Sequence, residues 1–205
     1  MRLRPRQKLF VERSLSALGT RANTLGIAPT GAGKTIMLSA VTGESLGDSA
    51  SKACVLAHRD ELTAQNRDKF RRVVPGVSTS VVDATTKSWD GQVTFAMVPT
   101  LARQANLAGM PTLDLLVIDE AHHAVADSYR RIVDRVREAN PDARVFGVTA
   151  TPNRGDRKGL REVFDNVGDQ VTLAELIASG HLVPPRTVLG LGSNHDRCEL
   201  KSEVF

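Results

Sequence analysis

The stretch APTGAGKT, residues 28–35, decides how this chain folds. It nearly matches the pattern G-x-x-x-x-G-K-[ST], with Ala28 in the place of the first glycine. In loops of this kind, glycines let successive backbone N–H groups form a cradle, a lysine reaches the outer phosphates and a hydroxyl contacts magnesium. Gly31 and Gly33 provide the backbone freedom, Lys34 the cation and Thr35 the hydroxyl. The stretch therefore predicts a phosphate-binding turn, and the alternative is a chance glycine-rich turn.

The residues on either side of this turn favour the phosphate-binding interpretation. An apolar run leads in from Thr24, and Ile36, Met37, Ala40 and Val41 continue at helical spacing. A helix that begins at the turn points its N-terminus, and with it the positive end of the helix dipole, at a bound phosphate.

Short β-branched and apolar runs recur along the chain between helical patterns. The runs are Thr24–Ala28, Cys54–Ala57, Val77–Val82, Val93–Val98, Leu113–Ile118 and Val145–Thr149. Helical spacing is clear in Val125, Tyr129, Ile132, Val133 and Val136, and weaker in Leu62, Asn66 and Phe70. Thr172 and Glu175 form a capping-box pattern, and Gly180 marks a helix end. This alternation predicts an α/β fold, a mostly parallel sheet with helices on both faces.

Two adjacent carboxylates follow the apolar run LLVI, in the stretch LLVIDEAHHA. Asp119 and Glu120 then lie at the carboxyl edge of the sheet, where ligands of open α/β folds bind. There Asp119 can hold magnesium and Glu120 can orient and deprotonate a water molecule. Together with the phosphate-binding turn, the acid pair predicts a nucleoside triphosphatase.

The neighbouring histidines allow a zinc site as an alternative. His122 and His123 are adjacent, and His58 is the third candidate ligand. Adjacent side chains point in different directions on a strand or helix, and no cysteine is close in sequence to the histidine pair, so the pattern disfavours a zinc site.

Composition sets the limits of the prediction. With 205 residues, 41% of them hydrophobic, the chain can bury one full core. The formal charge is +4, which is compatible with a polyanionic partner and weak support for one. Cys54 and Cys198 lack metal-ligand or disulfide spacing, and no apolar run approaches the about 18 residues that span a bilayer. We expect a single cytoplasmic domain over residues 1–187 that makes no membrane contact, with residues 188–205 as a tail or the start of something else.

The sequence resembles the superfamily 2 helicases and translocases of the DEAD/DEAH-box branch. The matching stretches are APTGAGKT (28–35), VLAHRDEL (55–62), DEAH (119–122) and GVTATP (147–152), in the order of motifs I, Ia, II and III. The stretches DEAHH, TATPNRGD and LAELIASGHLVPPR are most similar to repair-type and restriction-type DNA motors. Alanine in the first position of motif I is common in this family, so Ala28 fits.

The resemblance implies a RecA-like ATP-binding fold, with ATP and magnesium as cofactors and nucleic acid, DNA rather than RNA, as partner. It implies that Gln7 reads the adenine edge, that Lys34 and Glu120 serve catalysis, and that Thr35 and Asp119 hold magnesium. It assigns the phosphate loop to Thr30, Gly31, Ala32, Gly33, Lys34 and Thr35. It assigns nucleic-acid contacts to Arg59 and Thr100, and coupling of the two sites to His122, Thr149 and Thr151.

Two departures from the family pattern matter. Arg6 stands where the family often has an aromatic residue before Gln7. No stretch like Q-x-x-G-R-x-x-R follows Pro185, so the chain is similar to the first motor domain only, with a second one lost, encoded separately or supplied by a partner chain. The leading hypothesis is the ATPase domain of a nucleic-acid motor. The alternative is a nucleotide-dependent nucleic-acid-binding or regulatory module without unwinding activity, and a metabolic kinase is disfavoured.

Overall fold

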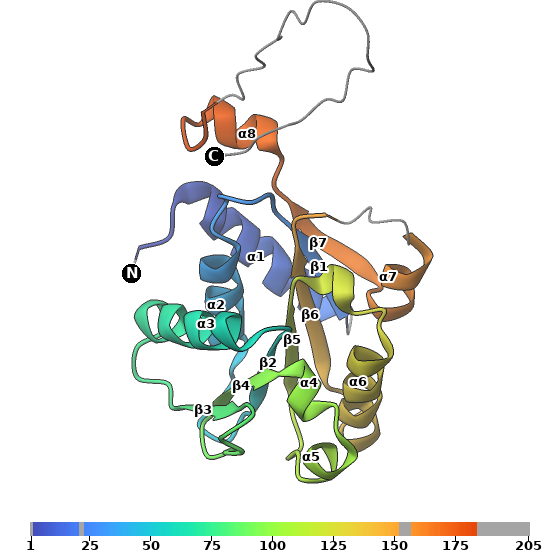
Figure 1. Cartoon of the computed structure of the whole chain (residues 1–205). Coiled ribbons are helices and arrows are strands. Elements are labelled where there is room, and N and C mark those ends of the chain that lie inside the picture. Colours follow the sequence, from blue (N-terminus) through green and yellow to red (C-terminus); the bar gives the residue numbers. More distant parts are fainter. Residues whose placement is uncertain (1, 21–22, 152–156, 184–205) are drawn as a thin grey trace, which may run out of the picture.

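A single seven-stranded parallel sheet organises the molecule (Figure 1). The computed structural model describes residues 2–20, 23–151 and 157–183. The strands are β1 (Asn23–Ile27), β2 (Ala53–Ala57), β3 (Thr79–Val82), β4 (Val93–Met97), β5 (Leu115–Asp119), β6 (Arg144–Thr149) and β7 (Asn166–Gln170). Their spatial order is β3-β4-β2-β5-β6-β1-β7, and every pairing between them is parallel. The predicted α/β fold with a mostly parallel sheet is confirmed.

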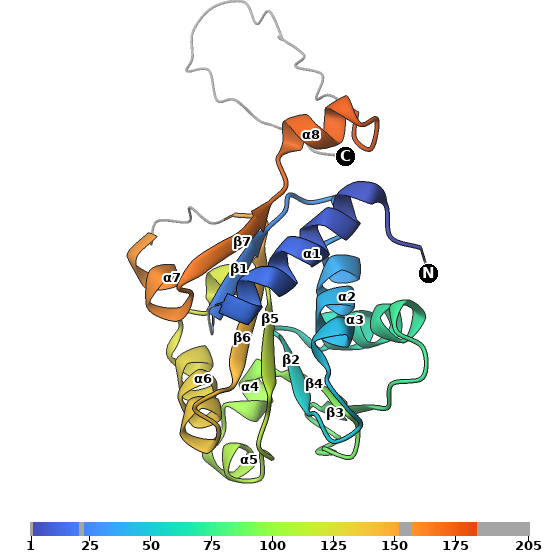
Figure 2. The same ribbon diagram turned by 180° about the vertical axis from the view of Figure 1, so that it is seen from behind.

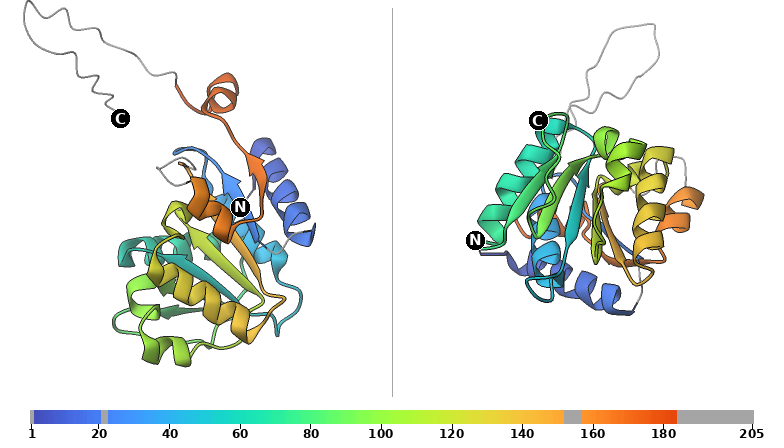
Figure 3. Two further views of the ribbon diagram at one scale, coloured as in Figure 1. Left: turned by 90° about the vertical axis from the view of Figure 1, so that its right-hand side faces the viewer. Right: turned by 90° about the horizontal axis from the view of Figure 1, so that it is seen from below.

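The helices lie between the strands in sequence and cover both faces of the sheet (Figures 2 and 3). They are α1 (Pro5–Thr20), α2 (Lys34–Ser45), α3 (Asp60–Val73), α4 (Val98–Leu101), α5 (Gln104–Ala108), the 3₁₀ turn η1 (Ala121–His123), α6 (Asp127–Ala139), α7 (Arg157–Val163) and α8 (Leu173–Ala178). Helices α1, α2 and α3 cover one face, and α4, α5, α6 and α7 the other (Figure 3). Helix α8 follows β7 beyond the end of the sheet (Figure 1). None of the helices in the described ranges is long and apolar enough to cross a membrane.

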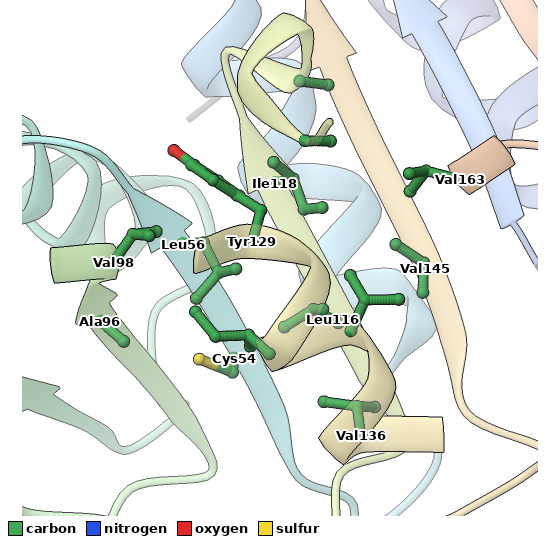
Figure 4. Packing of buried hydrophobic residues seen from close by; sticks show 14 of the residues in the cluster. Cys54, Leu56, Ala96, Val98, Leu116, Ile118, Tyr129, Val136, Val145 and Val163 are labelled. Atoms are coloured by element: carbon green, nitrogen blue, oxygen red, sulfur yellow. The ribbon is translucent and has the colours of Figure 1, made fainter. Parts of the chain in front are cut away.

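Each sheet face carries its own apolar core, because alternate residues of a strand point to opposite faces. On β5, Leu116 and Ile118 join the core beneath α6, whereas Leu115 and Val117 join the core beneath α1 and α2. Figure 4 shows the first of these cores, with Leu116, Ile118 and Tyr129 close together. Both faces of the central strands are buried, which is why these strands are nearly continuous apolar runs in the sequence.

Helix α1 and strand β7 were not predicted. Strand β7 has the sequence NVGDQ, with polar residues in three of its five positions and only Asp169 fully buried. Among the described residues it is an edge strand that pairs with β1 alone, so it needs no apolar alternation. The capping box predicted at Thr172 and Glu175 is confirmed at the start of α8.

Candidate active site

The predicted phosphate-binding turn joins β1 to α2 at the carboxyl edge of the sheet. Ala28 is fully buried, and its N–H donates to the carbonyl of Thr149 at 3.0 Å, which fixes the start of the turn to β6. Gly31 and Gly33 have φ values of 86° and 85°, a region that favours glycine. Alanine therefore suits the first position, which needs burial, and glycine the later two, which need backbone freedom.

Neighbouring side chains leave no room for larger residues at these glycines. A Cβ atom at Gly33 would lie 2.5 Å from Nε2 of Gln7, and one at Gly31 would lie 2.9 Å from a methyl of Leu182. Gln7 donates from Nε2 to the carbonyl of Ala32 at 3.0 Å and accepts from the N–H of Arg4 at 3.1 Å. Gln7, which is predicted to read adenine, therefore holds the turn by a hydrogen bond to its backbone.

The acid pair lies beside this turn. Asp119 is the last residue of β5, and Glu120 follows it in the left-handed backbone conformation with φ 52° and ψ 55°. Nζ of Lys34 lies 3.6 Å from Oε1 of Glu120. The fold thus brings together residues 34 and 119–120, which are far apart in the sequence.

Asp119 is held by hydrogen bonds on both carboxylate oxygens. Oδ1 accepts from the N–H of Glu120 at 3.0 Å, and Oδ2 accepts from Nδ2 of Asn66 at 2.9 Å. Burial raises the pKa of Asp119, the charge of Glu120 raises it further, and the hydrogen bonds and Lys34 oppose these effects. A positive ion next to this carboxylate would favour its charged form.

The donor set fits a magnesium ion. Mg²⁺ prefers carboxylate and hydroxyl oxygens, usually one or two protein groups together with substrate phosphates. Asp119 offers the carboxylate, Thr35 offers the hydroxyl in the first turn of α2, and the two positive-φ glycines lie in the predicted phosphate turn. These residues could hold the ion.

A chain of contacts leads from the acid pair to β6. Nδ1 of His122 lies 3.4 Å from Oε2 of Glu120 and 3.2 Å from Oγ1 of Thr149, and the N–H of Thr151 donates to the same hydroxyl at 3.2 Å. The three residues predicted to couple the two sites therefore lie in contact. His123 instead stacks on His58, with ring centroids 5.2 Å apart. Within the described ranges, no cluster of three or more histidine, cysteine or acidic residues has the arrangement of a metal site.

A hollow of about 380 Å³ opens beside Asp119 and Glu120. Its lining comprises Ala57, His58, Arg59, Glu61, Leu62, Gln65, Asp119, Glu120 and His123. Arg59, predicted to touch nucleic acid, therefore faces the same hollow as the acid pair. The structure does not bring Thr100 to this surface, because Thr100 is 2% exposed within the core that α4 covers. A phosphate contact by Thr100 would need this residue to be uncovered.

Sequence reasoning missed two sets of contacts, one at the candidate site and one that holds α1 to the sheet. Asn66 was assigned only to a helical pattern, although its amide bonds to Asp119. Arg6 was noted as a departure, but its role is structural: it pairs with Asp169 and Glu175, and donates to the carbonyl of Gln170 at 2.9 Å. Arg13 also donates to Asp169, at 2.9 Å. No sequence signal links residues so far apart.

Some predictions fall outside the described residues. These are Pro152 at the end of GVTATP, Cys198 and the tail of residues 188–205. The domain boundary at 187 also lies there, and it stays a prediction.

Comparison with known proteins shows which family the chain belongs to. The sequence model of the family "Type III restriction enzyme, res subunit" matches residues 1–154. "Putative ATP-dependent helicase IRC3" of Saccharomyces cerevisiae is 27% identical over 188 residues, which cover 85% of this chain and 27% of that protein. "Putative mitochondrial ATP-dependent helicase irc3" of Schizosaccharomyces pombe is 29% identical over 197 residues, which cover 92% of this chain and 32% of that protein. The chain thus spans only about a third or less of these relatives.

A solved structure supports the fold. The Type ISP restriction-modification enzyme LlaGI, in complex with a DNA substrate mimic, superposes with a TM-score of 0.67 and 15% identity, covering 88% of this chain and 21% of that one. At this identity the likeness concerns the fold alone.

Proposed function

Because the chain belongs to the family of the type III restriction enzyme res subunit and forms the N-terminal RecA-like domain of a superfamily 2 helicase, we propose that it binds and hydrolyses ATP with magnesium to drive a motor on nucleic acid. One observation carries the proposal: Lys34 of the phosphate turn lies 3.6 Å from Glu120, next to Asp119. Cation, metal-side carboxylate and catalytic carboxylate are the parts that phosphoryl transfer requires.

Each residue of the site has a role in this proposal. Lys34 and the backbone of residues 30–35 bind the phosphates, and Thr35 and Asp119 hold magnesium. Magnesium, when bound, neutralises charge that develops on the phosphates. Glu120 orients the attacking water and accepts its proton, which is feasible because Glu120 is only partly buried while its neighbour Asp119 is held by two hydrogen bonds. Gln7 reads the adenine edge.

The nucleic-acid contacts belong to the same proposal. Arg59 borders the hollow beside the acid pair, so a strand bound there would lie close to Glu120. His122, Thr149 and Thr151 would transmit a change at one site to the other through their contacts. We propose DNA rather than RNA, supported by the restriction-type family and by the DNA-bound LlaGI neighbour. A second motor domain or a partner subunit would complete the site, and a cytoplasmic location remains our expectation.

The second candidate is a nucleotide-dependent binding or regulatory module. The observation in its favour concerns cations: over the described residues, Lys34 is the only lysine or arginine in an ion pair with Glu120. Transition-state charge in phosphoryl transfer usually needs a further arginine. Without one, the site could bind nucleotide and respond to it while hydrolysing very little.

ATP turnover separates the two candidates. Turnover is measured alone and with single-stranded DNA, duplex DNA or RNA, for the wild type and for Glu120→Gln. A motor domain gives hydrolysis that Glu120→Gln abolishes. Nucleotide and nucleic-acid binding without any Glu120-dependent hydrolysis would instead establish the binding module, and absence of nucleotide binding would refute both.

A further inference from the structure

Asn66 is a polar side chain on the buried face of α3. The buried positions of this helix include Thr63, Asn66 and Phe70, at the spacing of one helix face, and Phe70 packs edge-on against Phe95. Asn66 is 2% exposed. A buried amide costs free energy unless it finds hydrogen-bond partners, so an apolar residue would serve packing better at this place. The contact that the amide makes therefore offsets the cost of its burial.

That contact is the carboxylate at the end of β5. Nδ2 of Asn66 donates to Oδ2 of Asp119 at 2.9 Å, and both residues are buried. The other oxygen, Oδ1, accepts from the N–H of Glu120 at 3.0 Å. An ionised carboxylate accepts about four hydrogen bonds or metal contacts, two for each oxygen. One hydrogen bond on each oxygen fixes the rotation of the carboxyl plane and leaves acceptor capacity on both.

We propose that Asn66 is the positioning residue for the magnesium-side carboxylate: its amide fixes the orientation in which Asp119 meets the ion. The proposal rests on the function proposed above. Groups that hydrogen-bond to a metal ligand determine its orientation, and their loss commonly lowers metal affinity about 10- to 100-fold. Asn66 acts through Asp119, so its removal changes the response to magnesium and spares the contacts that Lys34 and the turn make with the phosphates.

Helix α3 begins beside the hollow at the acid pair. The residue directly before α3 is Arg59, which lines the hollow together with Asp119 and Glu120. The residue at the predicted nucleic-acid surface and the residue that holds Asp119 are thus about two helical turns apart along the chain.

The test uses fluorescent ADP and the full chain, and needs no hydrolysis. Nucleotide affinity is measured in EDTA, and the magnesium concentration that gives half-maximal tightening of binding is measured separately. Asn66→Leu keeps the number and branching of the side-chain heavy atoms and removes the donor. We expect it to raise the half-saturating magnesium concentration about 10-fold and to leave the affinity in EDTA within about twofold of the wild type.

Thr63→Val is the matched control. Thr63 is as buried as Asn66, lies three residues earlier on the same helix, and its hydroxyl donates to the carbonyl of Arg59 rather than to Asp119. We expect no change in either measurement. If Asn66→Leu does not give the circular dichroism of the wild type, Asn66→Ser decides, because it keeps a donor too short to reach Asp119 and disturbs packing less.

The outcomes distinguish this inference from the proposed function. If the nucleotide affinity of the wild type does not depend on magnesium, the proposed function is refuted, and the inference with it. A wild type that responds to magnesium, with a folded Asn66 variant that responds equally, would overturn the inference alone. Equal losses in EDTA and in magnesium would also overturn it, because they would reveal a purely structural role.

Discussion

Asp169 fastens the N-terminal helix to the edge of the sheet, and its replacement by asparagine should destabilise the fold. Its side chain is 6% exposed and accepts hydrogen bonds from Arg6 and Arg13, both on α1. Burial raises the pKa of Asp169, but the hydrogen bonds and charges of the two arginines outweigh burial and hold the pKa below its usual value. The carboxylate is therefore ionised when the protein is folded.

The size of the effect follows from the exposure of the two arginines. The Arg6 side chain is 19% exposed, so its bond to the carboxylate contributes about 2 kcal/mol, as buried bonds to charged groups do. The Arg13 side chain is 55% exposed, and its bond contributes only about 0.5 kcal/mol because water screens it. The loss of about 2 to 3 kcal/mol lowers the melting temperature by about 6 to 9 °C for a domain of this size.

The effect should depend on pH in a definite direction. Because the folded pKa of Asp169 is lowered, its contribution is complete above the unfolded pKa of about 3.9 and is lost as the pH falls through the folded value. Protonated aspartate is neutral, as asparagine is. The difference in melting temperature between the wild type and Asp169→Asn should therefore be largest at pH 7 and should disappear in acid.

Thermal unfolding followed by circular dichroism, from neutral pH into acid, measures this gap. Asp165→Asn is the control, since Asp165 is exposed, precedes β7 and takes no part in the pair with Arg6. Equal melting temperatures for the wild type and Asp169→Asn at pH 7 would refute the reasoning. A gap of the same size in acid would show that its cause is not electrostatic.

Three further predictions concern the proposed site. Lys34→Ala should weaken ATP binding at least about tenfold in calorimetry, because Lys34 is the cation of the phosphate turn, and unchanged affinity would sink the assignment. Nucleic-acid binding should be weak, indifferent to sequence and steeply salt-dependent, because backbone phosphates are contacted, and a flat response to salt would contradict this. The 205-residue chain alone should hydrolyse ATP slowly and with little stimulation by nucleic acid, because a missing arginine can cost about 10³- to 10⁵-fold. Turnover of about 1 to 10³ per second that Glu120→Gln abolishes would disprove it and direct attention to an arginine lent across a homo-oligomer interface.

The sequence predicted the central strands well because these strands are buried on both faces. A strand such as β5 has to be apolar throughout, and its run is visible without any partner. Strand β7 was not predicted because an edge strand can be polar, and its place in the sheet is set by its pairing with β1. Helix α1 was not predicted because arginines interrupt the hydrophobic pattern at the start of the chain. Its buried face consists of Gln7, Phe10, Val11, Ser14 and Leu18.

The site was predictable where one short stretch carries the chemistry. Lys34 and the acid pair stand in local patterns, and the parallel topology brings both to one sheet edge. Asn66 and the pairing of Arg6 with Asp169 were not predictable, because each contact joins residues more than 50 positions apart. Hydrogen bonds of this kind depend on packing angles between elements, which spacing does not encode.

The position of β1 in the sheet has a consequence for the order of folding. Within the described part of the chain, the strand that leads into the predicted phosphate turn pairs only with β6 and β7, whose residues are 144–149 and 166–170. A ribosome-bound chain that ends near residue 140 therefore contains the whole turn but neither neighbour of its strand. Such non-local pairing is slow, and unpaired apolar strands invite aggregation. Strands β2 to β5 are complete once residue 119 has been made, whereas β1 gains its first neighbour only with residues 144–149, so this strand is paired late in synthesis.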